Sequence, residues 1–275
     1  MNNKNKYLIA IDLDGTLLNK HSKITWFNKY YLKKLDRKGH IIVLASGRPA
    51  RAVKFFYNQI GLTGPIICYN GAYTFHPIDK KFPTTAYNFK KQLVLDIYKE
   101  VGKEIATNCM CETDEQIWLE KHDEKLNRFF WQENMDIIYG DINETLDKDP
   151  WTFILQLKDR DHNDIIRNAV LKHKGYLVRF WTTYPYAEIY DENTSKAASI
   201  HQIAEYYGIP KERTIGIGDA DNDIEMMQEC GTSIAMKNGN KHVKALATMI
   251  SRKDHNHHGV AFAIKDFFKK NKVRP

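Results

Sequence analysis

The sequence predicts an α/β protein in which a parallel β-sheet between helices is interrupted by an inserted α+β module. Near both ends of the chain, short and continuously apolar runs alternate with helical patterns, which is typical of strands buried on both faces of a parallel sheet. In the middle, the expected strands alternate between apolar and polar residues, which favours an antiparallel sheet with one covered face. The chain has 275 residues, 43% of them hydrophobic, and this allows one large domain or two modest ones.

Three apolar runs in the N-terminal part predict strands of the parallel sheet. The first is YLIAIDL, residues 7–13, and it precedes a segment whose apolar residues share one helical face: Ile24, Phe27, Tyr31 and Leu35. The second is HIIVLA, residues 40–45, which precedes the helical pattern RPARAVKFFYNQIG. The third is PIICYN, residues 65–70. We expect these strands to be connected through the intervening helices.

The C-terminal part repeats the alternation of strand and helix. RTIGIGD, residues 213–219, follows a helical face formed by Ile200, Ile203, Ala204 and Tyr207. DIEMMQEC then leads to another apolar run, TSIAM, residues 232–236. We expect the two ends of the chain to build one βαβ core.

The middle segment has a different character. Its expected elements are, in order, a helix, strands at 107–112 and 115–120, a helix, a strand, a strand at 152–157, a helix at 161–174, and strands near 176–182 and 186–190. We therefore expect a core domain formed by residues 1–81 and 185–275, and an inserted α+β cap domain formed by residues 82–184.

Composition narrows the function classes. No stretch approaches the ~20 apolar residues of a membrane span, and MNNKNK leads directly into the first strand without the apolar region of a signal peptide, so we expect a soluble, cytoplasmic protein. The formal net charge is +7. The lysines are dispersed apart from the two termini, and no nucleic-acid-binding signature accompanies them. We expect attraction for small anionic substrates, without a nucleic-acid, membrane or obligate protein partner.

The cysteines and histidines do not have the spacing of a transition-metal site. Cys109 and Cys111 are the only close pair of the four cysteines, and their spacing is not that of a zinc pair. We interpret the cysteines as small apolar residues in a reduced compartment. The segment DHNHHG brings together His255, His257 and His258, and we interpret it as a solvated loop before the last helix.

Polar residues follow each core strand at the edge where ligands bind in a parallel α/β sheet. They are Asp12, Asp14, Gly15 and Thr16 after the first strand, Ser46, Gly47 and Arg48 after the second, Asn70 and Gly71 after the third, and Gly218, Asp219, Asp221, Asn222 and Asp223 after the late strand, with Lys196 opening the preceding helix. Clustered acids repel one another and lose hydration. A divalent cation makes such a cluster tolerable, and ligands that are all oxygen favour Mg²⁺.

This residue set suits phosphoryl chemistry. A carboxylate can attack phosphorus and form an acyl phosphate. The metal and a lysine offset the charge that develops on the phosphoryl oxygens. A second acid within reach can protonate the departing alkoxide and then deprotonate water.

Four segments, DLDGT, ASGRP, TSKA and GIGDADNDIEMM, in this order, resemble the motifs of the haloacid dehalogenase-like hydrolases. The segment NGA and the ending GVAFAI are similar to the Cof-type sugar-phosphate phosphatase branch of that family. The resemblance covers essentially the whole chain and implies a Rossmann-like core with an α+β cap between the second and third motifs. It also implies a Mg²⁺-dependent phosphatase that hydrolyses small phosphorylated metabolites, with sugar phosphates expected, through an aspartyl phosphate.

The resemblance implies a role for each matching residue. Asp12 is the nucleophile and a metal ligand, and Asp14 is the acid and base that also binds the metal through its backbone carbonyl. Asp219 completes the protein ligands, and Asp223 supports the metal. Phosphate or substrate binding falls to Leu13, Ser46, Gly47, Lys196 and Asn222. One departure is Ala197, because the branch usually has glycine after the lysine.

Several alternatives stay open at this point. The same acyl phosphate could pass to a sugar hydroxyl, as in a phosphomutase or phosphotransferase. A phospho-accepting regulatory domain also places acids, a hydroxyl and a lysine at strand ends, but such domains are about half as long. Arg48 either reaches substrate or fixes its own loop. In the cap, we expect Arg179, Trp181, Tyr184 and Tyr186 to be structural rather than substrate-reading residues.

Overall fold

The computed structural model describes residues 6–131, 135–181 and 184–273. These residues divide into two compact units. The first is formed by Met1–Thr84 together with Ser195–Pro275, and the second by Thr85–Thr194. Among the described residues, no helix combines the length and apolar character that a membrane span requires.

The first unit is built on a mainly parallel sheet. Its strands lie in the order β14-β13-β12-β1-β2-β3-β4, and all neighbours are parallel except β3 and β4, which are antiparallel. Their bounds are β1 (Leu8–Ile11), β2 (Ile41–Ala45), β3 (Ile66–Cys68), β4 (Tyr73–Phe75), β12 (Thr214–Gly218), β13 (Thr232–Ala235) and β14 (Met249–Ile250). The central strand β1 is fully buried along its length, as its unbroken apolar sequence predicts.

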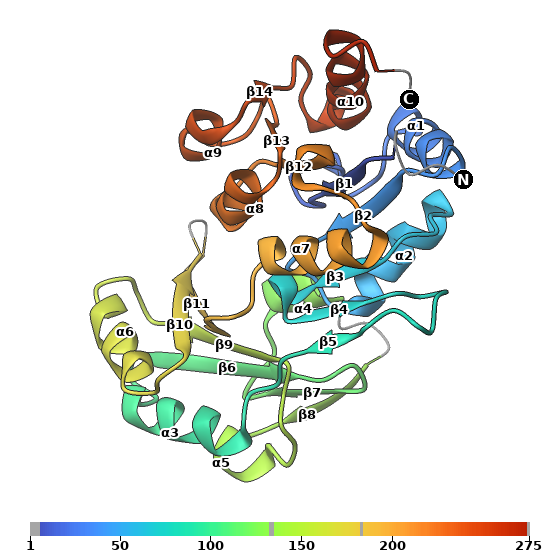
Figure 1. The fold of residues 1–275 in the computed structure, drawn as a ribbon. Helices are drawn as coiled ribbons and strands as arrows, with labels where there is room; N and C mark the ends of the chain where they lie inside the picture. Colours follow the sequence, from blue (N-terminus) through green and yellow to red (C-terminus); the bar gives the residue numbers. More distant parts are fainter. Residues whose placement is uncertain (1–5, 132–134, 182–183, 274–275) are drawn as a thin grey trace. The chain divides into compact units, whose positions relative to one another are not determined.

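Helices on the sheet complete the first unit (Figure 1). They are α1 (Trp26–Arg37), α2 (Ala50–Ile60), α7 (Lys196–Tyr207), α8 (Ile224–Glu229), α9 (Lys241–Leu246) and α10 (Gly259–Lys270), with short 3₁₀ turns η2 (Tyr69–Gly71), η3 (Lys211–Arg213), η4 (Asp221–Asp223) and η5 (His255–His257). Ile200 and Ile203 of α7 and Met226 of α8 form one buried cluster with Leu8 and Ala10 of β1. The helix α1 packs against α2 and α10.

The second unit contains a six-stranded sheet in the order β10-β11-β9-β6-β7-β8. All its strand pairs are antiparallel except β7 with β8, which are parallel. The elements are β5 (Thr85–Ala86), α3 (Lys91–Val101), β6 (Ala106–Glu112), β7 (Gln116–Leu119), α4 (Glu124–Phe130), β8 (Asp136–Tyr139), α5 (Ile142–Thr145), β9 (Thr152–Leu157), α6 (Asn163–Leu171), β10 (Tyr176–Phe180) and β11 (Tyr186–Asp191).

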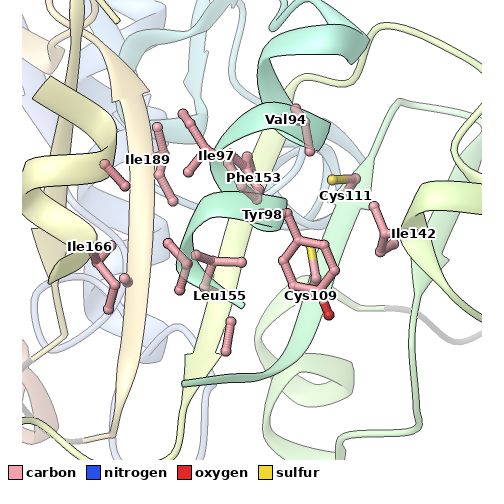
Figure 2. Close-up of a cluster of buried hydrophobic side chains, with 14 of the residues drawn as sticks. Val94, Ile97, Tyr98, Cys109, Cys111, Ile142, Phe153, Leu155, Ile166 and Ile189 are labelled. Atoms are coloured by element: carbon pink, nitrogen blue, oxygen red, sulfur yellow. The ribbon is translucent and has the colours of Figure 1, made fainter. Parts of the chain in front are cut away.

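One hydrophobic core holds the second unit together (Figure 2). Ile97 and Tyr98 of α3 and Ile166 of α6 point onto the sheet, where they meet Phe153 and Leu155 of β9. Cys109 and Cys111 lie in the same core, two residues apart on β6. All four cysteines are free and buried, which agrees with their interpretation as small apolar residues.

The fold class that we expected is confirmed: a parallel α/β core with an inserted α+β unit. The boundary differs at the far end, because the second unit runs to Thr194 instead of 184. The reason is β11, which pairs with both β9 and β10 and therefore belongs to the inserted sheet. The expected strand near 176–182 ends at Phe180, and residue 182 lies outside the described residues. The strands β4, β5 and β14 were not predicted.

Candidate active site

A buried lysine and two aspartates form the centre of the first unit's strand edge. Asp12 directly follows β1, and its Oδ1 accepts a hydrogen bond from Lys196 Nζ at 2.6 Å. The same ammonium donates to Oδ1 of Asp223 at 2.7 Å. The Lys196 side chain is only 1% exposed and Asp223 is fully buried. Residues 12, 196 and 223 are far apart in the sequence, and the parallel topology brings them together.

The start of α7 is held rigidly, and this fixes the position of Lys196. Ser195 caps the helix by accepting the N–H of Ala198. On the next turn, the Ser199 hydroxyl accepts from Thr74 at 2.7 Å. Gly71 adopts a φ of 109°, and a Cβ added there would lie 2.3 Å from the Ser195 carbonyl oxygen. Only glycine therefore allows η2 to approach the first turn of α7 this closely.

The loop after β12 brings Asp219 beside the same group. Asp223 Oδ2 accepts from the backbone N–H groups of Asp219, at 2.9 Å, and of Ala220. Thr16 donates its hydroxyl proton to Asp219 Oδ1 at 2.8 Å. A Cβ at Gly15 would lie 2.3 Å from Asp219 Oδ2. The DLDGT and GDADND loops are therefore interlocked through short contacts.

Burial and mutual repulsion make these carboxylates poor acids. Desolvation is the main cause that raises the pKa of Asp12 well above its usual value, and the charges of Asp223, Asp219 and Asp14 add to it, against the opposing effect of Lys196. Desolvation and Asp223 likewise raise the pKa of Asp219 to about 7. Burial alone would lower the pKa of Lys196, but Asp12 and Asp223 outweigh it and raise that pKa. The site holds more negative charge than its lysine compensates.

The donor set fits a hard divalent cation. Carboxylate oxygens of Asp12, Asp219 and Asp223 all lie within 4.8 Å of one another. Ligands that are all oxygen favour Mg²⁺ over zinc or copper, and a bound cation would relieve the repulsion that raises the two carboxylate pKa values. Asp221 is directed elsewhere, because its Oδ1 accepts from Asn240 and lies 3.2 Å from His242 Nδ1.

The second aspartate of DLDGT has a different partner. Arg48 binds Asp14 with two parallel hydrogen bonds, from Nε to Oδ2 and from Nη2 to Oδ1, each of 2.7 Å. The Arg48 side chain is 8% exposed, whereas that of Asp14 is 45% exposed. The guanidinium also lies over the Phe56 ring of α2, 5.8 Å from its centroid. A rigid, buried cation therefore orients a carboxylate that still faces solvent.

The remaining predicted residues lie on neighbouring loops. The buried Ser46 accepts the Arg48 N–H on its Oγ, and its carbonyl accepts from Asn70. Asn70, at a left-handed φ of 53°, receives a hydrogen bond from Asn222 Nδ2 at 3.1 Å. A Cβ at Gly47 would lie 2.9 Å from Asn70 Nδ2. The Leu13 side chain is fully buried, so any substrate contact from this residue has to come from its backbone.

A model of the haloacid dehalogenase-like hydrolase family matches residues 9–264. The chain belongs to the haloacid dehalogenase-like hydrolases. It is 31% identical over 272 residues to a 5-amino-6-(5-phospho-D-ribitylamino)uracil phosphatase of Bacillus subtilis (strain 168), covering 95% of this chain and 97% of that protein. It is also 25% identical to a phosphoglycolate phosphatase of Staphylothermus marinus, covering 90% of this chain and 91% of that protein.

Solved structures of the family share the fold. A haloacid dehalogenase-like hydrolase from Bacteroides thetaiotaomicron matches 96% of this chain and 100% of its own, with a TM-score of 0.80 and 24% identity. A sugar phosphatase of subclass IIB matches 95% of this chain and 99% of its own, with a TM-score of 0.78 and 19% identity. The expected family, its Rossmann-like core with an inserted α+β unit, and an enzyme of the phosphatase class are thereby confirmed.

Two features of this haloacid dehalogenase-like site were not predicted from the sequence. The role of Arg48 was open, and its pairing with Asp14 follows from a side-chain direction that no spacing encodes. Asn70 was noted only as a strand-end residue, although the motif NGA was the available signal. The substitution of Ala197 for glycine is accommodated, since Ala197 is buried within regular α7. The histidine segment forms the short turn η5, where His257 pairs with Asp254 at 2.7 Å.

Proposed function

We propose that this protein is a Mg²⁺-dependent phosphatase that hydrolyses small phosphorylated metabolites, with sugar phosphates as the first class to test, through an aspartyl phosphate on Asp12. The observation that carries this proposal is the buried Asp12–Lys196–Asp223 arrangement beside Asp219. Burial raises the pKa of Asp12, and the Lys196 ammonium opposes that effect; together with a bound cation it would favour the ionised carboxylate that acts as the nucleophile.

The two aspartates would divide the reaction. A carboxylate oxygen of Asp12 attacks phosphorus, the bond from phosphorus to the ester oxygen breaks, and Asp14 gives its proton to the departing alkoxide. In the second step, Asp14 takes a proton from water, the water oxygen attacks phosphorus, and the bond to Asp12 breaks. Arg48 holds Asp14 by both carboxylate oxygens, which keeps the acid and base group in one orientation for both steps.

The negative charge on the phosphoryl oxygens requires several hydrogen-bond donors and a cation. We assign Lys196, Ser46, Asn222 and the backbone of Gly47 and Leu13 to its oxygens. The hydrogen bond from Asn222 to Asn70 orients that amide, and the rigid start of α7 orients the ammonium. Donors that are fixed in advance avoid reorganisation during the reaction, and this is how such groups lower a barrier.

The metal would be held by Asp12, Asp219 and the backbone carbonyl of Asp14, with support from Asp223. Bound Mg²⁺ would supply positive charge against the phosphoryl oxygens and the carboxylates around them. Asp223 is already committed to Lys196 and to the amides of Asp219 and Ala220, so we assign it to holding the loop and the lysine in place.

The inserted unit, Thr85–Thr194, is proposed as the cap that selects the substrate. The relatives named above differ in what their names say they hydrolyse, although they align along almost the full chain. A shared core with a variable inserted unit accounts for such diversity. The proposal names a class of substrate and no single compound.

Phosphate release from a panel of sugar phosphates, nucleotides and cofactor phosphates tests this function. We expect release with Mg²⁺, none after exhaustive chelation, and recovery when Mg²⁺ is restored. The Asp219→Ala variant should need far more Mg²⁺ for half-maximal rate. Full activity after chelation would contradict the proposed metal site, and an isomerised sugar phosphate without free phosphate would identify a phosphomutase instead.

A further inference from the structure

The exposed face of α1 carries a groove that the phosphatase chemistry does not use. The groove has a volume of about 600 Å³ and is lined by residues of α1, the turn after it and the end of α2. Five of its eight lining residues are cations: Lys29, Lys33, Lys34, Arg37 and Lys38. All eight lie in the described part of the chain, and none of them is acidic.

Two aromatic rings are exposed in the same groove. Trp26 is 72% exposed and Tyr30 is 58% exposed, although most large apolar side chains of this unit are buried. The Trp26 ring touches Phe27 and His258 with ring centroids 5.4 and 5.6 Å apart, so it is supported at its edges while most of its surface faces solvent. Tyr31, Leu32 and Leu35 of the same helix are buried and keep α1 docked on the core.

The acid nearest this surface in the sequence is buried and pairs with Lys33, one of the five groove cations. Asp36 is 8% exposed, and one of its carboxylate oxygens accepts from both the N–H and the hydroxyl of Thr63. The other oxygen lies 3.5 Å from the ammonium of Lys33, which also donates to the Gly61 carbonyl. Within the described residues, no ion pair is found for the exposed Lys29, Lys34 or Arg37.

The positive charge belongs to the whole first unit. This unit contains 27 lysine and arginine residues and 13 aspartate and glutamate residues, a formal net charge of +14, whereas the second unit carries 14 and 21, a net charge of −7. Residues 1–84 hold only four acids: Asp12 and Asp14 in the active site, the buried Asp36, and Asp79. The net charge of +7 for the chain hides this separation.

A second helix beside α1 also carries exposed cations. The helix α10 packs beside α1 (Figure 1), and its last turn carries the exposed Lys269 and Lys270. That turn is anchored by Phe267 and Phe268, whose rings contact Tyr7 at the start of β1. Exposed cations therefore also lie on the helix that packs beside α1.

We propose that this groove binds single-stranded nucleic acid, with the phosphates on the α1 cations and bases stacked on Trp26 and Tyr30. Proteins that bind single strands without sequence preference combine a basic groove with exposed aromatic rings. A duplex offers no unstacked bases to these rings, and the flat surface of an anionic bilayer does not enter a groove. We expected no nucleic-acid partner from the sequence because most lysines are dispersed along the chain, but five cations within residues 29–38 line one groove together with two exposed rings.

Fluorescence anisotropy with a labelled oligodeoxythymidylate of about 16 nucleotides tests the proposal. The probe carries no terminal phosphate monoester, so the active site is not offered its reacting group. We expect a dissociation constant on the order of 1–100 µM that weakens steeply between about 50 and 200 mM salt. Replacing Lys29 and Lys34 by glutamine should reduce the slope of log affinity against log salt by about 1.4, since each phosphate contact on a single strand contributes about 0.7.

Matched variants separate a specific groove from general attraction. Lys241→Gln with Lys253→Gln removes two exposed lysines elsewhere on the first unit and should change binding little. Trp26→Ala should weaken binding about tenfold, while Trp26→Phe, which keeps a ring, should lose much less. Phosphatase activity of all these variants should match the native protein, which shows that they fold.

Three results would overturn the proposal. One is the absence of oligonucleotide binding at low salt. Another is equal weakening by the two lysine pairs together with no effect of Trp26→Ala, which would show only diffuse attraction by a basic protein. The third is cosedimentation with phosphatidylglycerol vesicles without oligonucleotide binding, which would assign the surface to a membrane.

Discussion

At the scale of single residues, Arg48 orients Asp14, and Asp14 is the group that we propose moves the protons. The carboxylate is 45% exposed while the guanidinium is 8% exposed, so the proposed acid and base faces solvent and the residue that supports it is buried. The fork of two 2.7 Å hydrogen bonds fixes the plane of the carboxylate. Loss of that support should affect the steps in which Asp14 moves a proton more than the attack by Asp12.

Arg48→Met should therefore reduce turnover in a way that depends on the leaving group. For a sugar phosphate, whose alkoxide needs a proton, we expect kcat/KM to fall about 10–100-fold, the effect of a misplaced catalytic group. For nitrophenyl phosphate the rate of enzyme phosphorylation should fall much less. Arg48→Lys should not restore activity, because one ammonium does not reproduce the two-point contact. Equal losses with both substrates would mean that Arg48 acts on the phosphate-binding loop instead.

A second residue, His40, should make stability depend on pH. It is buried beside Phe268, and its Nδ1 accepts the Tyr7 N–H. Burial, with a smaller effect of the Lys38 charge, lowers its pKa to about 4, whereas an unfolded histidine titrates near 6.5. Below that pH the unfolded state binds a proton that the folded state refuses, so the stabilisation present above about pH 6.5 is lost as pH falls towards 4.

The free energy of unfolding at fixed Mg²⁺ measures this effect. Between pH 7.5 and pH 5, the native protein should lose roughly 2 kcal/mol more than His40→Gln does. His21→Gln, which changes an exposed histidine, should keep the native pH dependence. Parallel curves for the native protein and His40→Gln would show that His40 is protonated equally in both states.

At the scale of elements, the strand edges of the core were predictable and the turns were not. Asp12, Ser46, Asp219 and Lys196 could be placed together because continuously apolar strands imply a parallel sheet whose carboxyl ends share one edge. The left-handed Asn70 and the short antiparallel β4 could not, since three residues give too little pattern and a positive φ leaves no periodic trace. The close approach of Gly71 to the Ser195 carbonyl depends on the backbone of Asn70 and on β4, which flank this glycine.

The variant Gly71→Ala tests whether that contact positions Lys196. The added methyl would meet the Ser195 carbonyl at 2.3 Å, while Gly175→Ala, at a φ of 92°, meets nothing closer than 4.0 Å. We expect Gly175→Ala to cost about 1 kcal/mol, the strain of a left-handed residue, and to leave activity intact. Gly71→Ala should cost at least about 2 kcal/mol more and should lower kcat as well. Equal losses of stability and kcat in the two variants would show that η2 does not position Lys196.

At the scale of the whole molecule, the two units carry formal net charges of opposite sign. The sequence indicated an insertion because its strands change from continuously apolar to alternating, but it placed the far boundary before β11, whose pairing with β9 is a long-range choice. The charge difference between the units was also open to prediction once a boundary was drawn. The exposure of Trp26 and Tyr30 beside the lysines of α1 required the fold, because the sequence does not show which side chains face solvent.

Deletion of the inserted unit tests its proposed role. Replacing residues 85–194 by a short glycine-serine linker should leave a folded core, since each unit has its own buried cluster. The truncated protein should still be stabilised by Mg²⁺ in thermal unfolding but should lose the order of preference among phosphate esters. A truncated protein that keeps the native ranking would show that the core selects the substrate.

Trapping the phosphorylated enzyme tests most directly whether Asp12 is the nucleophile and Asp14 the acid and base. Nitrophenolate leaves without a proton, so Asp14→Asn should still be phosphorylated by nitrophenyl phosphate with Mg²⁺ and then stall, because no base activates water. Asp12→Asn has no attacking carboxylate. Intact-protein mass spectrometry after acid quench should show one added phosphoryl group on Asp14→Asn and none on Asp12→Asn. A phosphoryl group on Asp12→Asn would contradict the assignment.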